Sequence, residues 1–246
     1  MRDDEPELSG SGAPIYRHQA PPEGDEPLAE GDLGLIQAIS DHVERHVGPV
    51  EQVFHEIVSP TIHVDIHWVA PSRERPWHTL VTSGMSERPM NVPPEATEWA
   101  YAELMVALPA SWPLTMEAFD DEANYWPLRW LKILARFPHE YQTWLGFGHT
   151  IPNGDPPEPF APSTRLSGMM LVPPLRYPEE FWRLDLAPEK KINFWCLLPL
   201  YAEEMDLKLR KGADALIDLF EQADVNEVLN PSRPNVAATR RWWRFR

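Results

Sequence analysis

HTLVTSGMSERPM, residues 78–90, is the stretch around which we expect the fold to be organised. The residues of its first half alternate between two faces, as they do in a half-buried strand. Gly84 ends the alternation, and the polar, proline-bounded segment that follows cannot continue a strand. That segment contains two large apolar residues, Met85 and Met90. We therefore predict a strand over residues 77–83, followed by a turn that packs back on the protein.

Further strands are predicted on both sides of this stretch. The candidates are VEQVFHEIV (50–58), TIHVDIHWV (61–69), EWAYAELMVAL (98–108), the start of WLGFGHTIPNGDPPEPF (144–160), RLSGMMLVPP (165–174) and KINFWCLLPLY (191–201). The last is the most apolar run of the chain, which favours a central strand covered on both faces. Short turns between closely spaced strands favour antiparallel pairing.

Helical periodicity predicts four helices, over residues 33–47, 124–138, 202–212 and 213–222. Asp32 is a candidate N-cap for the first helix and Asn124 for the second, and Gly212 ends or bends the third. Helices and strands alternate in mixed order without an internal repeat. The sequence therefore predicts an α+β fold, with a single domain built on a central, mainly antiparallel or mixed sheet with flanking helices.

The two ends of the chain differ in composition from its middle. Residues 1–32 hold nine acids, two bases and five prolines, and we predict a disordered acidic tail. Residues 237–246 form a basic aromatic C-terminal tail, which could bind phosphates or a membrane surface but could equally dock on an acidic surface. The predicted domain spans residues 33–236.

The charge balance limits the partners that this chain can have. The net charge is −16, and residues 33–230 alone carry −14 because the tails nearly cancel each other. Such a chain repels nucleic acid and anionic membranes and attracts basic proteins, so we expect a protein partner, no nucleic acid and no membrane. The N-terminus lacks the apolar region of a secretory signal, and the single cysteine, Cys196, cannot form an intramolecular disulfide. A cytoplasmic location is therefore expected.

One group of residues could bind a metal ion. His63, Asp65 and His67 alternate along the predicted strand 61–69 and share one face, which would suit a transition metal. Alternate side chains on a strand lie about 7 Å apart, so three such ligands rarely reach one ion without help from another segment. His78 could give that help. The simpler interpretation is the polar, solvent-facing side of an amphipathic strand.

No other motif indicates catalysis. The sequence has no G-x-S-x-G, G-x-G-x-x-G, P-loop or H-E-x-x-H pattern. Ser83 and Ser86 flank Gly84 and are more typical of turn serines that satisfy backbone groups than of nucleophiles. We therefore expect a protein that is not an enzyme and has no cofactor.

Several stretches resemble one known family. They are HVDIHWVAP (63–71), HTLVTSGMSERPM (78–90), YAELMVALP (101–109), WPLRWLKILARFPHEYQTWLGFGHTIPNG (126–154), MMLVPP (169–174), INFWCLLPLYAEEMDLKLRKGADALIDLF (192–220) and NPSRPNV (230–236). From about His55 to Val236 the chain resembles the Suppressor of fused-like domain family, as a bacterial single-domain member. The resemblance implies a compact domain with a mainly antiparallel sheet, flanking helices and no catalytic chemistry.

The resemblance also implies a function. The animal protein binds and restrains transcription factors, and similar bacterial domains are implied to be immunity proteins that neutralise polymorphic toxins. The alternatives are a scaffold or regulatory protein with a non-toxin partner, or a metal-dependent enzyme using His63, Asp65 and His67. For a protein-binding face we expect the loops 84–91 and 149–160, with Trp77, Arg88 and Asp155 as candidate contact residues.

Overall fold

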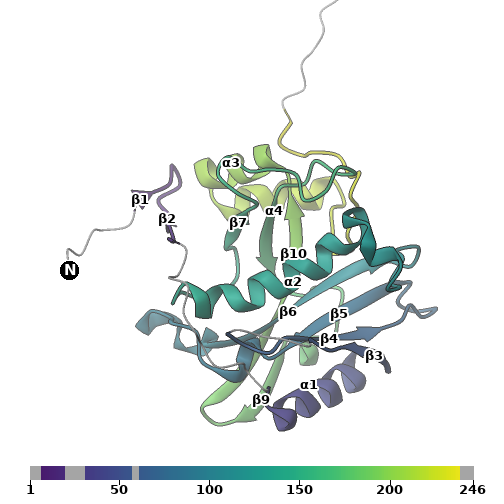
Figure 1. Cartoon of the computed structure of the whole chain (residues 1–246). Coiled ribbons are helices and arrows are strands. Elements are labelled where there is room, and N and C mark those ends of the chain that lie inside the picture. Colours follow the sequence, from purple (N-terminus) through teal and green to yellow (C-terminus); the bar gives the residue numbers. More distant parts are fainter. Residues whose placement is uncertain (1–6, 20–30, 57–60, 239–246) are drawn as a thin grey trace, which may run out of the picture.

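The computed structural model describes residues 7–19, 31–56 and 61–238. Most of the strands in these ranges form one eight-stranded sheet, which Figure 1 shows. Its strands are β3 (Val50–Phe54), β4 (Asp65–Val69), β5 (Trp77–Ser83), β6 (Tyr101–Pro109), β7 (Thr150–Pro152), β8 (Gly168–Val172), β9 (Arg183–Ala187) and β10 (Lys190–Leu200). The spatial order is β3-β4-β5-β6-β10-β8-β7, and β9 also pairs with β10.

The pairing within the sheet is antiparallel with one exception. β6 and β10 run parallel, with Tyr101 opposite Ile192 and Met105 opposite Cys196. The other edge of β10 is shared, because β9 pairs with its first residues and β8 with its last. The long apolar run 191–201 is therefore a central strand, as predicted, and the sheet is mixed but mostly antiparallel.

Helices cover both faces of this sheet. They are α1 (Leu33–His46), α2 (Glu122–Glu140), α3 (Ala202–Lys211) and α4 (Ala213–Gln222), with short 3₁₀ turns η1 (Met85–Glu87), η2 (Pro94–Trp99), η3 (Ala118–Asp120) and η4 (Glu179–Phe181). Consecutive residues of β6 belong to different hydrophobic cores, one on each face of the sheet. Leu104 lies in the core with residues of α2, whereas Met105 lies in the core with residues of α1 and α4. Figure 1 shows α2 crossing one face of the sheet and α1 beside β3. The predicted α+β class is confirmed.

Most of the stretch that we expected to organise the fold is buried, and one carboxylate holds its turn. Glu103 on β6 is fully buried and accepts hydrogen bonds from Thr82 Oγ1, Gly84 N, Ser86 N and Ser86 Oγ at 2.6 to 3.0 Å. Gly84 has φ 118°, and a side-chain carbon there would lie 1.9 Å from the carbonyl oxygen of His63. Only glycine fits such a position. Ser86 thus lies in a turn, as predicted, but its hydroxyl donates to Glu103 and not to a backbone group, whereas Ser83 is the last residue of β5.

Some local predictions were wrong. The cap of α2 is Asp121, whose side chain accepts from Ala123 N, whereas the Asn124 side chain donates to Ala118 O. The strand expected from residue 144 starts at Thr150 instead, after a turn at residues 147–148. The strand β9 was not predicted, since its alternation is mostly polar and exposed.

The polar face expected on the strand 61–69 is not exposed to solvent. Asp65 and His67 are 1% and 0% exposed, because they point to the side of the sheet that α1 covers. The solvent-facing interpretation of these residues was therefore wrong.

The N-terminal segment differs from the expectation of disorder in residues 7–19. Two short strands, β1 (Glu7–Leu8) and β2 (Pro14–Ile15), pair antiparallel, and Ser11 N donates to Leu209 O of α3 at 3.0 Å. Residues 1–6 and 20–30 of the predicted acidic tail lie outside the described residues, as do residues 239–246 of the basic aromatic tail. No helix in the described part of the chain is long and apolar enough to cross a membrane.

Candidate functional site

The three predicted contact residues do not form one site. Trp77 opens β5 and is half-buried, with its indole Nε1 donating to Tyr177 Oη at 2.9 Å. Arg88 follows the other end of β5, is exposed, and donates to Thr61 O at 2.5 Å. A seven-residue strand is about 20 Å long, so these two side chains lie far apart. Asp155 lies beyond β7, where its carboxylate is 87% exposed.

A surface groove lies beside the end of α2. Its walls are residues 91–93, which follow the organising stretch, and residues 141–144, which follow α2. Asn91 N donates to Thr143 O at 3.1 Å, and Asn91 Nδ2 donates to Gln142 O at 2.8 Å. These bonds hold the two walls together. The groove thus adjoins the loop 84–91, one of the two loops in which we expected a binding face.

The N-terminal segment lies along this groove. Tyr16, Arg17 and His18 contribute to its lining and have no regular secondary structure. The His18 ring is 5.2 Å from that of Phe137, edge to face, and 5.5 Å from that of Tyr141. Arg17 pairs with Asp155 at 3.6 Å, so one predicted residue also contacts this segment. The N-terminal segment therefore forms one wall of the groove, and ring contacts and one exposed ion pair attach it to the rest of the domain.

The segment is not deeply buried. Residues 16–19 are all exposed, and such ring contacts and exposed ion pairs contribute little free energy each. Sequence reasoning missed this site because His18 and Tyr141 are 123 positions apart in a chain with no motif to connect them.

The predicted metal ligands are only partly brought together. His63 and Asp65 lie close to each other, but the third member of the cluster is His55, not His67. His67 Nε2 is hydrogen-bonded to Ser83 Oγ at 2.9 Å, and burial lowers the pKa of His67 to about 4. The strand pairing explains the exchange: β3 and β4 place Phe54 opposite Ile66, so that His55 comes next to Asp65.

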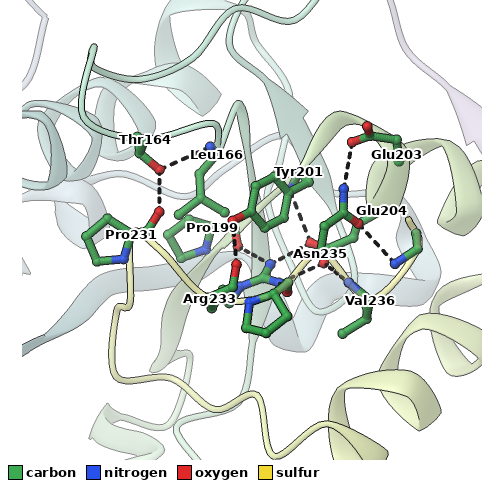
Figure 2. A network of polar contacts seen from close by, with 12 residues as sticks. Thr164, Leu166, Pro199, Tyr201, Glu203, Glu204, Pro231, Arg233, Asn235 and Val236 are labelled. Atoms are coloured by element: carbon green, nitrogen blue, oxygen red, sulfur yellow. Dashed lines mark hydrogen bonds and ion pairs between the residues drawn. The ribbon is translucent and has the colours of Figure 1, made fainter. Parts of the chain in front are cut away.

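A second polar network, drawn in Figure 2, is structural. Arg233 is buried and donates to both carboxylate oxygens of Glu204, at 2.7 and 2.5 Å, and to Pro199 O at 2.8 Å. The Tyr201 hydroxyl donates to Arg233 O at 2.5 Å. These bonds attach the C-terminal segment to the start of α3.

The fold defines a class: an α+β domain with a mixed, mostly antiparallel sheet and helices on both faces. A family model for Suppressor of fused protein (SUFU) matches residues 60–234. The chain belongs to the SUFU family.

Solved structures agree with this assignment at the level of the fold. A putative SUFU homolog from Neisseria gonorrhoeae is 15% identical, with a TM-score of 0.60 over 84% of this chain and 99% of that chain. The Sufu–Fu complex structure gives 16% identity and a TM-score of 0.57, over 82% of this chain and 92% of that chain. Drosophila Suppressor of Fused gives 14% and 0.57 over 89% of this chain, which spans only 52% of that protein. No curated protein matches significantly.

Proposed function

We propose that this chain is a non-enzymatic protein-binding domain, and that the groove of residues 91–93 and 141–144 receives an extended segment of its partner. The observation that carries the proposal is the position of residues 16–18, which lie along the groove with His18 against Phe137 and Tyr141. A surface that accommodates one extended segment through aromatic rings can accommodate another of similar chemistry. The Sufu–Fu complex is a structure of a relative with a bound protein.

The partner that we propose is a basic toxin domain, which would make this chain a cytoplasmic immunity protein. The net charge of −16 supports a basic partner, because opposite charge speeds encounter and disfavours acidic competitors. Many toxins act on nucleic acid and carry a basic surface, to which an acidic inhibitor is complementary.

Isothermal titration calorimetry against basic toxin domains encoded near the gene tests the proposal. A stoichiometric complex is expected, and the toxin should be inactive when the two proteins are coexpressed. Tyr141→Ala should weaken binding about tenfold or more, as the loss of an aromatic anchor does. Leu186→Ala is the matched control, since Leu186 is an exposed apolar residue on β9, away from the groove.

Deleting residues 1–19 is the second test. Removing residues 16–18 takes the His18 ring away from Phe137 and Tyr141, so partner binding should tighten by about two- to tenfold because these two rings are then free to contact the partner. Equal affinity of Tyr141→Ala, the deletion and the wild type would refute the groove, and no binding to any basic toxin domain would refute the immunity role.

A further inference from the structure

We propose that His55, His63 and Asp65 form a binding site for a divalent transition-metal ion of the zinc type. The inference is independent of the groove and of the partner, because the three residues lie where β3 and β4 meet, and none of them lines the groove.

The ligand groups of the three residues lie close together, with one imidazole beside each oxygen of the Asp65 carboxylate. His55 Nδ1 lies 3.0 Å from Asp65 Oδ2, and His63 Nε2 lies 2.9 Å from Asp65 Oδ1. All three ligand atoms lie within 4.8 Å of one another. A tetrahedral zinc ion, with ligands at about 2.0–2.2 Å, keeps its ligand atoms about 3.4 Å apart. Small side-chain rotations therefore suffice to place an ion between them.

Each ligand comes from a different backbone position. His55 directly follows β3, Asp65 is the first residue of β4, and His63 lies two residues before it. Alternate residues of one strand rarely converge on an ion by themselves, but His63 precedes β4 and its imidazole is directed toward Asp65. The cross-strand neighbour His55 completes the set. The predicted set of His63, Asp65 and His67 lacked this neighbouring ligand from the end of β3.

The three side chains of the cluster differ in their exposure to solvent. The Asp65 side chain is 1% exposed, that of His63 is 17% exposed and that of His55 is 68% exposed. Asp65 Oδ1 also accepts from Glu56 N at 3.2 Å, which orients the carboxylate. A buried, oriented carboxylate and two imidazoles supply three of the four ligands of a tetrahedral zinc ion, and a solvent molecule would be the fourth, as in an open zinc site.

The donor set selects the kind of metal. Two imidazole nitrogens and one carboxylate oxygen suit Zn²⁺ and its transition-metal neighbours, whereas Mg²⁺ and Ca²⁺ prefer oxygen ligands alone. A bound ion would connect residue 55 to residues 63 and 65 and so hold the end of the β3–β4 pair. Its first effect is therefore on stability.

Thermal unfolding and calorimetry of the chelator-treated full-length protein test this site. Addition of Zn²⁺ should give 1:1 binding and raise the melting temperature by about 4 °C or more at saturation, while excess Mg²⁺ should not. His55→Gln and His63→Gln should each weaken Zn²⁺ binding at least tenfold. Both replace partly exposed side chains, so the variants should stay folded, unlike a change at buried Asp65.

His46→Gln is the matched control, because His46 lies at the end of α1, apart from the cluster. It should bind Zn²⁺ as the wild type does. Two results would overturn the proposal: no stoichiometric Zn²⁺ binding by the wild type, or equal Zn²⁺ affinity of the wild type and the double variant His55→Gln/His63→Gln. Both measurements are made without a partner protein, so either outcome leaves the proposed function untouched.

Discussion

The carboxylate of Glu103 decides how the chain turns after β5. It is fully buried on β6 and accepts from two side-chain hydroxyls and two backbone N–H groups of residues 82–86. Burial raises the pKa of Glu103, and the hydrogen bonds, which favour the charged form, oppose that rise. One side chain thus replaces the backbone partners that the turn lacks.

Replacing Glu103 by glutamine should lower the free energy of unfolding by about 3 kcal/mol. The glutamine amide presents an NH₂ group to donors that need an acceptor, and a buried unsatisfied group is costly. Urea denaturation measures the loss. Glu95→Gln, at an exposed position of η2, removes the same charge and should change stability by less than about 0.5 kcal/mol. Equal effects of the two changes would contradict this role for Glu103.

His149 makes stability depend on pH. Burial, and then the nearby charge of Lys208, lower its pKa to about 4. An unfolded histidine binds its proton near pH 6.5, so between pH 6.5 and 4 the unfolded state holds more protons and the folded state loses stability as the pH falls. Up to about 3 kcal/mol should be lost over this range, in which His67 also contributes.

His149→Phe tests that pH dependence, because it keeps a ring against Trp144 and removes the titrating group. The difference in unfolding free energy between pH 7 and pH 4.5 should be smaller than in the wild type. An unchanged difference would show that His149 does not titrate in this range.

At the scale of elements, the C-terminal segment is held to α3 by a buried ion pair. Arg233 lies over the rings of Tyr201 and Phe220, at 5.0 and 5.2 Å, while its guanidinium binds both oxygens of Glu204. Glu204 also accepts from Tyr201 N and Val236 N, at 3.0 Å each. Figure 2 shows how these bonds join the helix start to residues 233–236.

Arg233→Met should cost about 3–5 kcal/mol of stability, because it leaves the Glu204 carboxylate buried without its counter-charge. Chemical denaturation should show the loss. Adding Glu204→Gln should recover part of it, since the double change leaves no buried charge. Arg165→Met, whose side chain is 77% exposed and 3.7 Å from Glu203, should have an effect below about 0.5 kcal/mol. A double variant no more stable than Arg233→Met would argue against the charge as the cause.

At the scale of the whole molecule, charge should control the rate of partner binding. With a net charge of −16, association with a basic partner should slow about tenfold or more between 20 and 500 mM salt, while dissociation changes little. Stopped-flow mixing or surface plasmon resonance separates the two rates. A salt-independent association rate would point to a partner without a basic face.

Local patterns predicted much of the fold. The limits of β5 agree with the predicted strand, and the apolar run 191–201 lies at the centre of the sheet. The strand β9 and the hairpin of β1 and β2 were not predicted, because they have little apolar periodicity. Asp65 and His67 were wrongly predicted to be exposed, because nothing in the local sequence indicates that a helix covers these polar residues.

The candidate sites depended far more on tertiary structure. Of the three predicted contact residues, only Asp155 contacts the segment that lies along the groove, through Arg17. The residues of the metal cluster come together through the pairing of β3 with β4, which places His55 beside Asp65.

The sequence by itself determined the class of fold, the acidic charge and the membership of the SUFU family, because hydrophobic period, composition and motifs are properties of consecutive residues. Tertiary structure alone decided which side chains meet. Residues 16–18 reach the end of α2, Arg233 reaches Glu204, and His55 reaches His63. Each of these contacts joins segments that are distant in the sequence. Strand pairing and the packing of helices on the sheet bring such segments together, and no pattern of consecutive residues indicates which segments will meet.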